Sequence, residues 1–93
     1  MSAEAKALIE LAAAELKVAG AREVYVFGSA AKGAEGAASD LDLAVSGLPP
    51  SVFYRVGARI SDVLGRSVDL VDLDVSTPFT RYLRQENELV RVG

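Results

Sequence analysis

Apolar residues recur every three or four positions in three segments of the chain, and this is the spacing of one face of a helix. The first segment, residues 3–19, consists almost wholly of strong helix formers. The second spans residues 50–65, and the third spans residues 77–88 and opens with a Thr-Pro pair. The apolar side of the third segment is formed by Phe79, Tyr82 and Leu83. We predict a helix in each segment, with one face buried.

Three further segments, residues 23–28, 41–47 and 67–73, are rich in β-branched, aromatic or alternating apolar residues, which predicts strands. Residues 29–32 are able to begin a short helix, whereas residues 33–39 are small and predict a loop. The expected order is α-β-β-α-β-α, without an internal repeat or a linker. We therefore expect an α/β (α+β) fold in which a small mixed β-sheet carries helices packed on one face.

The composition describes a single globular domain over residues 1–93. A chain of this length closes one modest core, and its 51% hydrophobic and 25% charged residues are typical of globular proteins. The net charge of −3 argues against direct nucleic-acid binding, because non-specific binding to a phosphate backbone needs clustered Lys and Arg. With no Cys and no His, disulfides, the usual zinc sites and His-based triads are excluded. Catalysis must then use carboxylates, hydroxyls, Lys, Arg or a hard metal ion.

The sequence carries no sign of a membrane or export signal. No apolar stretch approaches the roughly 20 residues that span a bilayer. The N-terminus also lacks a Lys- or Arg-led apolar run that ends in a cleavage site. We therefore expect a cytoplasmic protein.

Two aspartates lie together at the start of the second predicted strand. Side chains alternate along a strand, so Asp40 and Asp42 share one face while the leucines between and after them face the core. Their Cα atoms are then about 6 to 7 Å apart, and without a cation the pair repels itself and one pKa rises. A hard divalent ion removes that penalty, and two Mg²⁺ ions about 3.5 to 4 Å apart are able to share both carboxylates.

The Gly28-Ser29 turn follows the first predicted strand and is suited to an anion. The missing Cβ at Gly28 lets backbone amides approach a ligand closely, and the helix start at Ser29 offers free N–H groups to phosphate oxygens. Lys32, one helical turn further on, adds a positive charge for the same anion. The turn thus predicts a phosphate site beside the aspartates.

The third predicted strand supplies a further carboxylate. Asp69 enters this strand early and is flanked by apolar residues, whereas Asp72 and Asp74 lie at its exit, near solvent. We predict Asp69 as the third metal ligand or the base, and Asp72 and Asp74 as surface residues.

Taken together, these residues are similar to a known family. Gly28-Ser29, ten intervening residues, the Asp-Leu-Asp of residues 40–42 and Asp69 in "VDLV" resemble the polymerase-beta-like nucleotidyltransferase superfamily. The small size, and a resemblance that extends from the first helix to "RYLRQENELV", point to its minimal nucleotidyltransferase branch, which includes antitoxins of the MntA type.

The resemblance implies a role for each site residue. Asp40 and Asp42 would hold Mg²⁺, Asp69 would complete the metal site and assist the attacking hydroxyl, and Gly28 and Ser29 would bind the triphosphate. One feature differs, because Ala30 follows Gly-Ser where many relatives have a larger or basic residue. Lys32 is then left as the side-chain cation for the phosphates.

The resemblance also implies a substrate and a partner. Relatives of this branch are typically encoded beside a helical HEPN-type protein and act as antitoxins that transfer AMP from ATP to the partner, or that block it by binding. We expect a Mg²⁺-dependent transfer of AMP to a protein hydroxyl, with ATP as the donor and a partner that covers a half-exposed nucleotide. A non-catalytic binding module of the same fold is the alternative, transfer to a small molecule is a third reading, and a homo-oligomer is compatible with the sequence.

Overall fold

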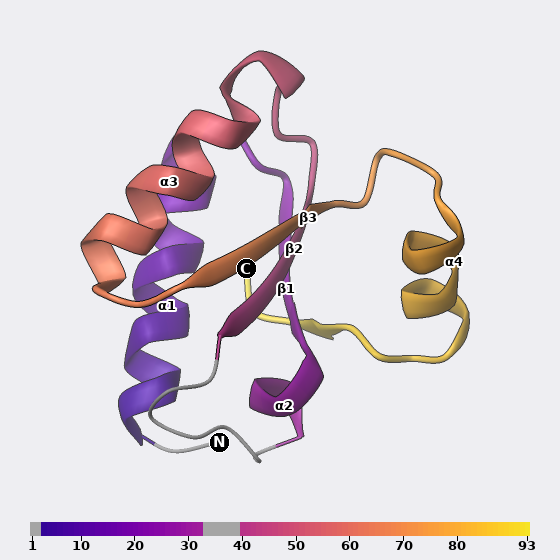
Figure 1. Cartoon of the computed structure of the whole chain (residues 1–93), viewed down its shortest axis with the longest axis horizontal. Helices are drawn as coiled ribbons and strands as arrows, with labels where there is room; N and C mark the ends of the chain where they lie inside the picture. The colour runs from indigo at the N-terminus through magenta and orange to yellow at the C-terminus, as the bar shows by residue number, and fades with distance from the viewer. Residues whose placement is uncertain (1–2, 33–39) are drawn as a thin grey trace.

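The computed structural model describes residues 3–32 and 40–93, with the Ser29 side chain left out; the predicted loop at 33–39 lies outside the described residues. The elements run in the order α1 (Ala3–Val18), β1 (Glu23–Phe27), α2 (Gly28–Ala31), β2 (Leu41–Ser46), a 3-10 turn (Pro50–Val52), α3 (Phe53–Leu64), β3 (Val68–Asp72), α4 (Pro78–Gln85) and β4 (Val90–Arg91) (Figure 1). Every predicted helix and strand is present. None of the helices that the structure describes is long and apolar enough to span a bilayer.

The strands form a mixed sheet in the order β3-β2-β1-β4, which confirms the predicted fold class. β1 pairs antiparallel with both β2 and β4, while β2 and β3 are parallel. A parallel pair needs a crossover connection, and α3 supplies it. The two-residue strand β4 was not predicted, because a segment this short has no periodicity of its own and forms a strand only by pairing with Tyr25 and Val26.

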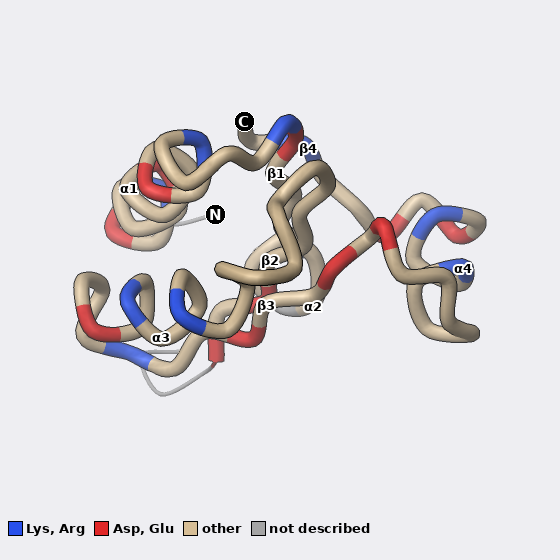
Figure 2. Tube along the Cα trace, turned by 90° about the horizontal axis from the view of Figure 1, so that it is seen from above, with Lys and Arg blue, Asp and Glu red and all other residues tan. Residues whose placement is uncertain are grey.

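The main core lies between the sheet and the helices α1 and α3. Figure 2 shows both helices on the same side of the strands. Large side chains from all these elements are almost fully buried here, namely Ile9, Leu16, Val24, Val26, Leu41, Leu43, Val45 and Ile60. The alternation predicted for β2 therefore holds, with its leucines turned toward the helices and Asp42 turned away.

Helix α4 lies on the opposite side of the sheet (Figures 1 and 2). It adds Leu83 to a second, smaller cluster with Phe27, Ala44 and Leu73. The predicted helical layer thus consists of α1 and α3, and the other face is partly covered as well. Ala44, which shares the face of Asp42, is fully buried for this reason.

The ends of α4 have clear local causes. Thr77 accepts a hydrogen bond from the backbone N–H of Thr80, and the Thr80 hydroxyl accepts one from the N–H of Thr77, which is a reciprocal capping arrangement. The helix ends at Gln85, three residues before the predicted end, and Asn87 follows with a left-handed φ of 54°. Such a conformation cannot continue a right-handed helix. The chain turns there and returns to the sheet as β4.

Candidate active site

Three side chains form a row across the sheet on the face away from α1 and α3. Phe27 of β1 is the register partner of Asp42 of β2, and Asp42 is the register partner of Asp69 of β3. Register partners point to the same face of a pleated sheet. Asp42 is half-buried and Asp69 is exposed. We call Phe27, Asp42 and Asp69 the cross-strand row; it brings together two of the three predicted carboxylates.

The surroundings of Asp42 disfavour its negative charge. Burial raises the pKa of its carboxyl above the ordinary value, the charge of Asp69 and a hydrogen bond with the Asp69 side chain raise it further, and the charge of Asp40 adds to the effect. All of these causes act in the same direction. A bound cation would counteract the repulsion from Asp69 and Asp40 and lower the pKa of Asp42, because it favours the charged form of each carboxylate.

Gly28 lies directly against the Asp42 carboxylate. Its φ is +71°, in the region that L side chains rarely adopt, and an added Cβ would collide with Asp42 Oδ2 and lie 3.2 Å from Asp42 Cγ. Glycine is therefore required both by the backbone and by the space. The turn that was predicted to bind phosphate thus touches the carboxylate that was predicted to bind metal.

The residue after Gly-Ser is small for a structural reason. Ala30 is 1% exposed and belongs to the main core, so α2 is anchored to the core through it. A basic side chain at this position would have to be buried among apolar residues. The departure from the family pattern noted at Ala30 is therefore part of how α2 packs.

The remaining predicted site residues are placed less tightly. Asp40 is exposed just before β2, near enough for its charge to act on Asp42. Within residues 3–32 and 40–93, no three acidic side chains are grouped closely enough to hold a metal ion. Lys32 is exposed and forms an ion pair with Glu88, Nζ to Oε2 3.6 Å. The structure describes the backbone of Ser29 but not its side chain.

The carboxylates of the row fit a hard divalent cation. Mg²⁺ is commonly held by one or two protein carboxylates, keeps several waters and takes further oxygens from substrate phosphates. Asp42 and Asp69 provide two such carboxylates side by side, and among the described residues burial and the neighbouring carboxylates raise the pKa of Asp42. Asp40 lies near enough for its charge to act on Asp42.

A hollow of about 250 Å³ opens on the other side of Gly28, between α2 and α4. We call it the aromatic hollow; it is lined by Phe27, Gly28, Lys32, Phe79, Tyr82, Leu83 and Glu88. Phe79 meets Phe27 edge to face, with ring centroids 5.8 Å apart. Phe79 and Tyr82 are each 49% exposed, so the prediction that both form the buried side of their helix is wrong, whereas Leu83 is buried as predicted. Sequence reasoning did not connect Phe79, Tyr82 or Glu88 with the site, because helical spacing alone does not say which neighbour a helix packs against.

The chain matches the family model described as "Polymerase beta, Nucleotidyltransferase" over residues 7–91. It therefore belongs to the polymerase beta nucleotidyltransferase family. The predicted resemblance to this family is confirmed.

Solved structures with this fold include a candidate minimal nucleotidyltransferase, 30% identical, with a TM-score of 0.66 over 97% of this chain and 90% of that chain. A toxin-antitoxin crystal structure with AMP-PNP is 22% identical, with a TM-score of 0.72 over 97% of this chain and 72% of that one. A structure of tri-AMPylated Shewanella oneidensis HEPN toxin in complex with MNT antitoxin contributes a chain 21% identical, with a TM-score of 0.63 over 92% and 70%. The last two likenesses show the fold alone. No curated protein sequence matches at a significant level.

Proposed function

We propose that this protein is a Mg²⁺-dependent nucleotidyltransferase that moves AMP from ATP to a hydroxyl of a partner protein, as the antitoxin of an MNT/HEPN pair. The observation that carries the proposal is the contact of Gly28 with Asp42, which in turn is paired with Asp69. It joins a turn suited to phosphate with carboxylates suited to metal. The family membership supports the class of reaction, and the described neighbours, among them an AMPylated toxin bound to its antitoxin, support the donor and the partner.

The residues have distinct roles in this proposal. Asp40, Asp42 and Asp69 would hold Mg²⁺, which when bound would stabilise negative charge on the phosphates. Gly28 and the backbone of Ser29 receive the triphosphate. Positioning of the acceptor against the α-phosphate supplies much of the rate, as in other phosphoryl transfers.

Lys32 acts on the phosphates of the donor, and Asp69 acts on the hydroxyl of the acceptor. Lys32 leaves Glu88 to meet the phosphates, and the cost is small because exposed ion pairs contribute about 0 to 1 kcal/mol. Asp69 is exposed at the end of the cross-strand row and accepts the proton of the attacking hydroxyl. The aromatic hollow lies beside Gly28, where the rest of the nucleotide has room.

A non-catalytic antitoxin of the same fold is the second candidate. The observation that favours it is that two large aromatic side chains of α4, Phe79 and Tyr82, are half exposed and available to a partner. Such a protein would neutralise a helical partner by covering it and would have no need of nucleotide. It would still use the exposed aromatic side chains of α4 for binding.

Intact mass spectrometry separates the two candidates. The chain is co-expressed with the HEPN-type protein encoded beside it, purified, and incubated with Mg²⁺ and ATP. A transferase adds one or more AMP units of about 329 Da to the partner, and Asp42→Asn adds none. A partner that co-purifies equally with both chains and gains no mass would refute the enzymatic proposal and establish the binding module.

A further inference from the structure

The aromatic hollow has the size and the lining for one flat ring system. Its volume of about 250 Å³ is below the roughly 300 Å³ at which pockets for whole drug-sized ligands begin. Phe79 and Tyr82 lie about one helical turn apart on α4, line the hollow and are each 49% exposed. Exposed aromatic side chains bind nucleobases by stacking, because every base has a π-face. The hollow is therefore suited to the base of a nucleotide rather than to the whole molecule.

The hollow is continuous with the carboxylate site through Gly28. This glycine lines the hollow, and its missing Cβ faces the carboxylate of Asp42. Lys32 also lines the hollow and is exposed, so its charge is available to a phosphate. In a nucleotide one ribose separates the phosphates from the base. A nucleotide whose phosphates lie at Gly28 and Asp42 thus has its base within reach of Phe79 and Tyr82.

The carboxylate of Glu88 connects two side chains that line the hollow. Its Oε2 lies 3.6 Å from Lys32 Nζ, and its Oε1 accepts from the Tyr82 hydroxyl at 3.5 Å. When phosphates take Lys32, Glu88 keeps an acceptor oxygen in the hollow, and its side chain is only 24% exposed. A polar group that is largely removed from water needs a new donor. The amino group of adenine is such a donor, whereas a ring carbonyl at the same place would present a second acceptor.

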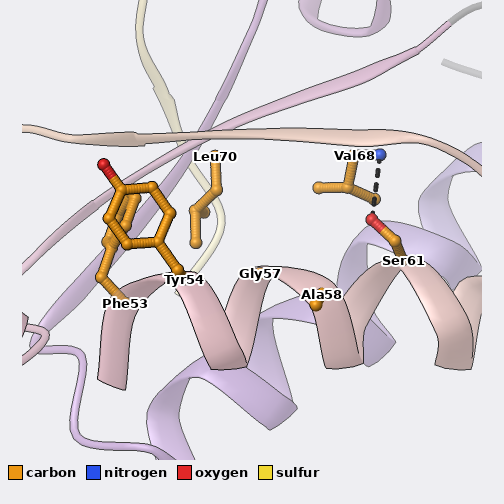
Figure 3. A pocket seen from close by; sticks show the side chains of 7 residues that line it. All are labelled: Phe53, Tyr54, Gly57, Ala58, Ser61, Val68 and Leu70. Carbon is orange, nitrogen blue, oxygen red and sulfur yellow. Dashed lines mark hydrogen bonds between the residues drawn. The ribbon is translucent and has the colours of Figure 1, made fainter. Parts of the chain in front are cut away.

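A second hollow, of about 280 Å³, lies between α3 and β3 and serves as a comparison (Figure 3). It also has an exposed tyrosine, Tyr54, but no charged side chain is found among its described lining residues. Val68 and Leu70 of β3 line it and pack with the main core, whereas Asp69 between them shares the face of Asp42. The second hollow is thus separated from the carboxylates by the sheet, and only the aromatic hollow adjoins them.

We propose that the aromatic hollow binds the base of the donor nucleotide, with Phe79 and Tyr82 as the stacking surface and Glu88 as the group that selects a base with an amino substituent, such as adenine. This inference rests on the proposed function and assigns the residues that choose its donor. Binding exchanges both partners of the ion pair, because the phosphates take Lys32 and the amino group takes Glu88.

Stacking is tested by comparing ATP with inorganic tripolyphosphate, which has no base. Isothermal titration calorimetry of the full chain with Mg²⁺ gives the affinity for each. Phe79→Leu and Tyr82→Leu keep apolar bulk but lose the ring, so each should weaken ATP about fivefold or more and tripolyphosphate by less than about twofold. Tyr82→Phe keeps the ring and should bind ATP within about twofold of the wild type. Tyr54→Leu, the same substitution in the second hollow, should change neither affinity.

The role of Glu88 is tested with purine riboside triphosphate, which is ATP without the amino group. The wild type should bind ATP about fivefold or more tightly than this analogue. Glu88→Leu should bind both alike, because the acceptor is gone. Glu88→Gln should keep the preference for ATP, because its amide oxygen is able to accept from the amino group.

Two results would overturn the inference and leave the proposed function intact. One is a change of the same factor for ATP and tripolyphosphate, or no change, in both leucine variants; the aromatic side chains would then be left for a partner protein. The other is a preference for ATP over the analogue that persists in Glu88→Leu. If neither ATP nor tripolyphosphate binds to the wild type, the proposed function fails and the inference with it. Should Phe79→Leu fail to fold, Tyr82→Leu decides, since Tyr82 is not part of the second cluster.

Discussion

Asp42 of β2 and Asp69 of β3 are direct register neighbours in a parallel pair, and their carboxyl groups interact on the face of the sheet away from α1 and α3. Twenty-six residues separate them in the sequence. Burial and like charge make this pair unfavourable in the chain alone. The predictions below follow from that cost and from the cation that would relieve it.

The metal-free protein should become more stable when Asp42 is neutralised. The pKa of Asp42 is higher in the folded than in the unfolded state, so the folded state binds the proton more tightly. Its contribution to stability is complete below the unfolded pKa and is lost as pH rises through the raised one. Without metal, Asp42→Asn should therefore exceed the wild type in free energy of unfolding at pH 7, and the gain should shrink toward pH 4. Urea unfolding at several pH values measures it. Asp62→Asn, at an exposed position, should show no such trend, and a gain for Asp42→Asn that does not vary with pH would contradict the explanation.

Mg²⁺ and ATP should stabilise the wild type and not Asp42→Asn. Binding to the folded state adds RT ln(1 + [L]/Kd), about 1.4 kcal/mol at a ligand concentration tenfold above Kd. For a domain of this size that corresponds to roughly 5 to 10 °C in melting temperature. Differential scanning fluorimetry with millimolar Mg²⁺ and ATP, followed by excess EDTA, is the measurement. If Asp42→Asn keeps the shift in melting temperature, the binding site for Mg²⁺ and ATP does not depend on Asp42 of β2.

Gly28→Ala should lower the free energy of unfolding by more than the left-handed backbone conformation alone would cause. Gly65 has a nearly equal φ of +66°, with open space around its missing Cβ, so Gly65→Ala measures the left-handed strain by itself. That strain is about 1 to 2 kcal/mol. Gly28→Ala adds the collision with the Asp42 carboxylate, and we expect a larger loss of stability together with loss of the shift by Mg²⁺ and ATP. Equal losses in the two variants, with the shift retained, would mean that Asp42 moves aside freely.

Asp69→Asn should abolish AMP transfer, whereas Asp72→Asn should leave it within a few fold. Asp69 shares the row of Asp42, while Asp72 is the register partner of Val45 and lies three positions along the strand, on the alternate face. Asp72 Oδ1 accepts a hydrogen bond from the N–H of Asp74 at 3.0 Å, and an asparagine oxygen is able to accept it as well. Transfer rates and far-UV circular dichroism of both variants check this. The reverse result would place the acceptor-side carboxylate at the exit of β3.

Glu88→Gln should tighten nucleotide binding. Lys32 is paired with Glu88 across the aromatic hollow, and a phosphate would compete with that carboxylate for the ammonium group. Because exposed pairs contribute about 0 to 1 kcal/mol, the gain in affinity should be at most about fivefold, and Lys32→Ala should weaken binding. The double variant controls for other effects of Glu88: if it binds better than Lys32→Ala alone, the gain does not pass through Lys32.

Several features of the fold and the candidate site follow from the local sequence alone. Alternation along residues 41–45 put Leu41 and Leu43 in the core and Asp42 on the opposite face, because a strand has a period of two wherever it lies. The glycine of the Gly28-Ser29 turn was recognised because it lacks a Cβ, and Gly28 does lie where a Cβ has no room. These features depend on one segment at a time.

The tertiary structure decided which segments meet. The register that sets Asp69 beside Asp42 results from the packing of α3 as the crossover between β2 and β3, and no pattern within either strand encodes it. The position of α4 buries Ala44 and leaves Phe79 and Tyr82 half exposed beside Gly28, although helical spacing treats all apolar positions of α4 alike. Strand β4 forms only because the chain turns back at Asn87, which allows Val90 and Arg91 to pair with β1. The periodicity of a segment predicts whether a side chain faces the core or the solvent. It does not predict which residue of another segment that side chain contacts, because this depends on how all the helices and strands pack together.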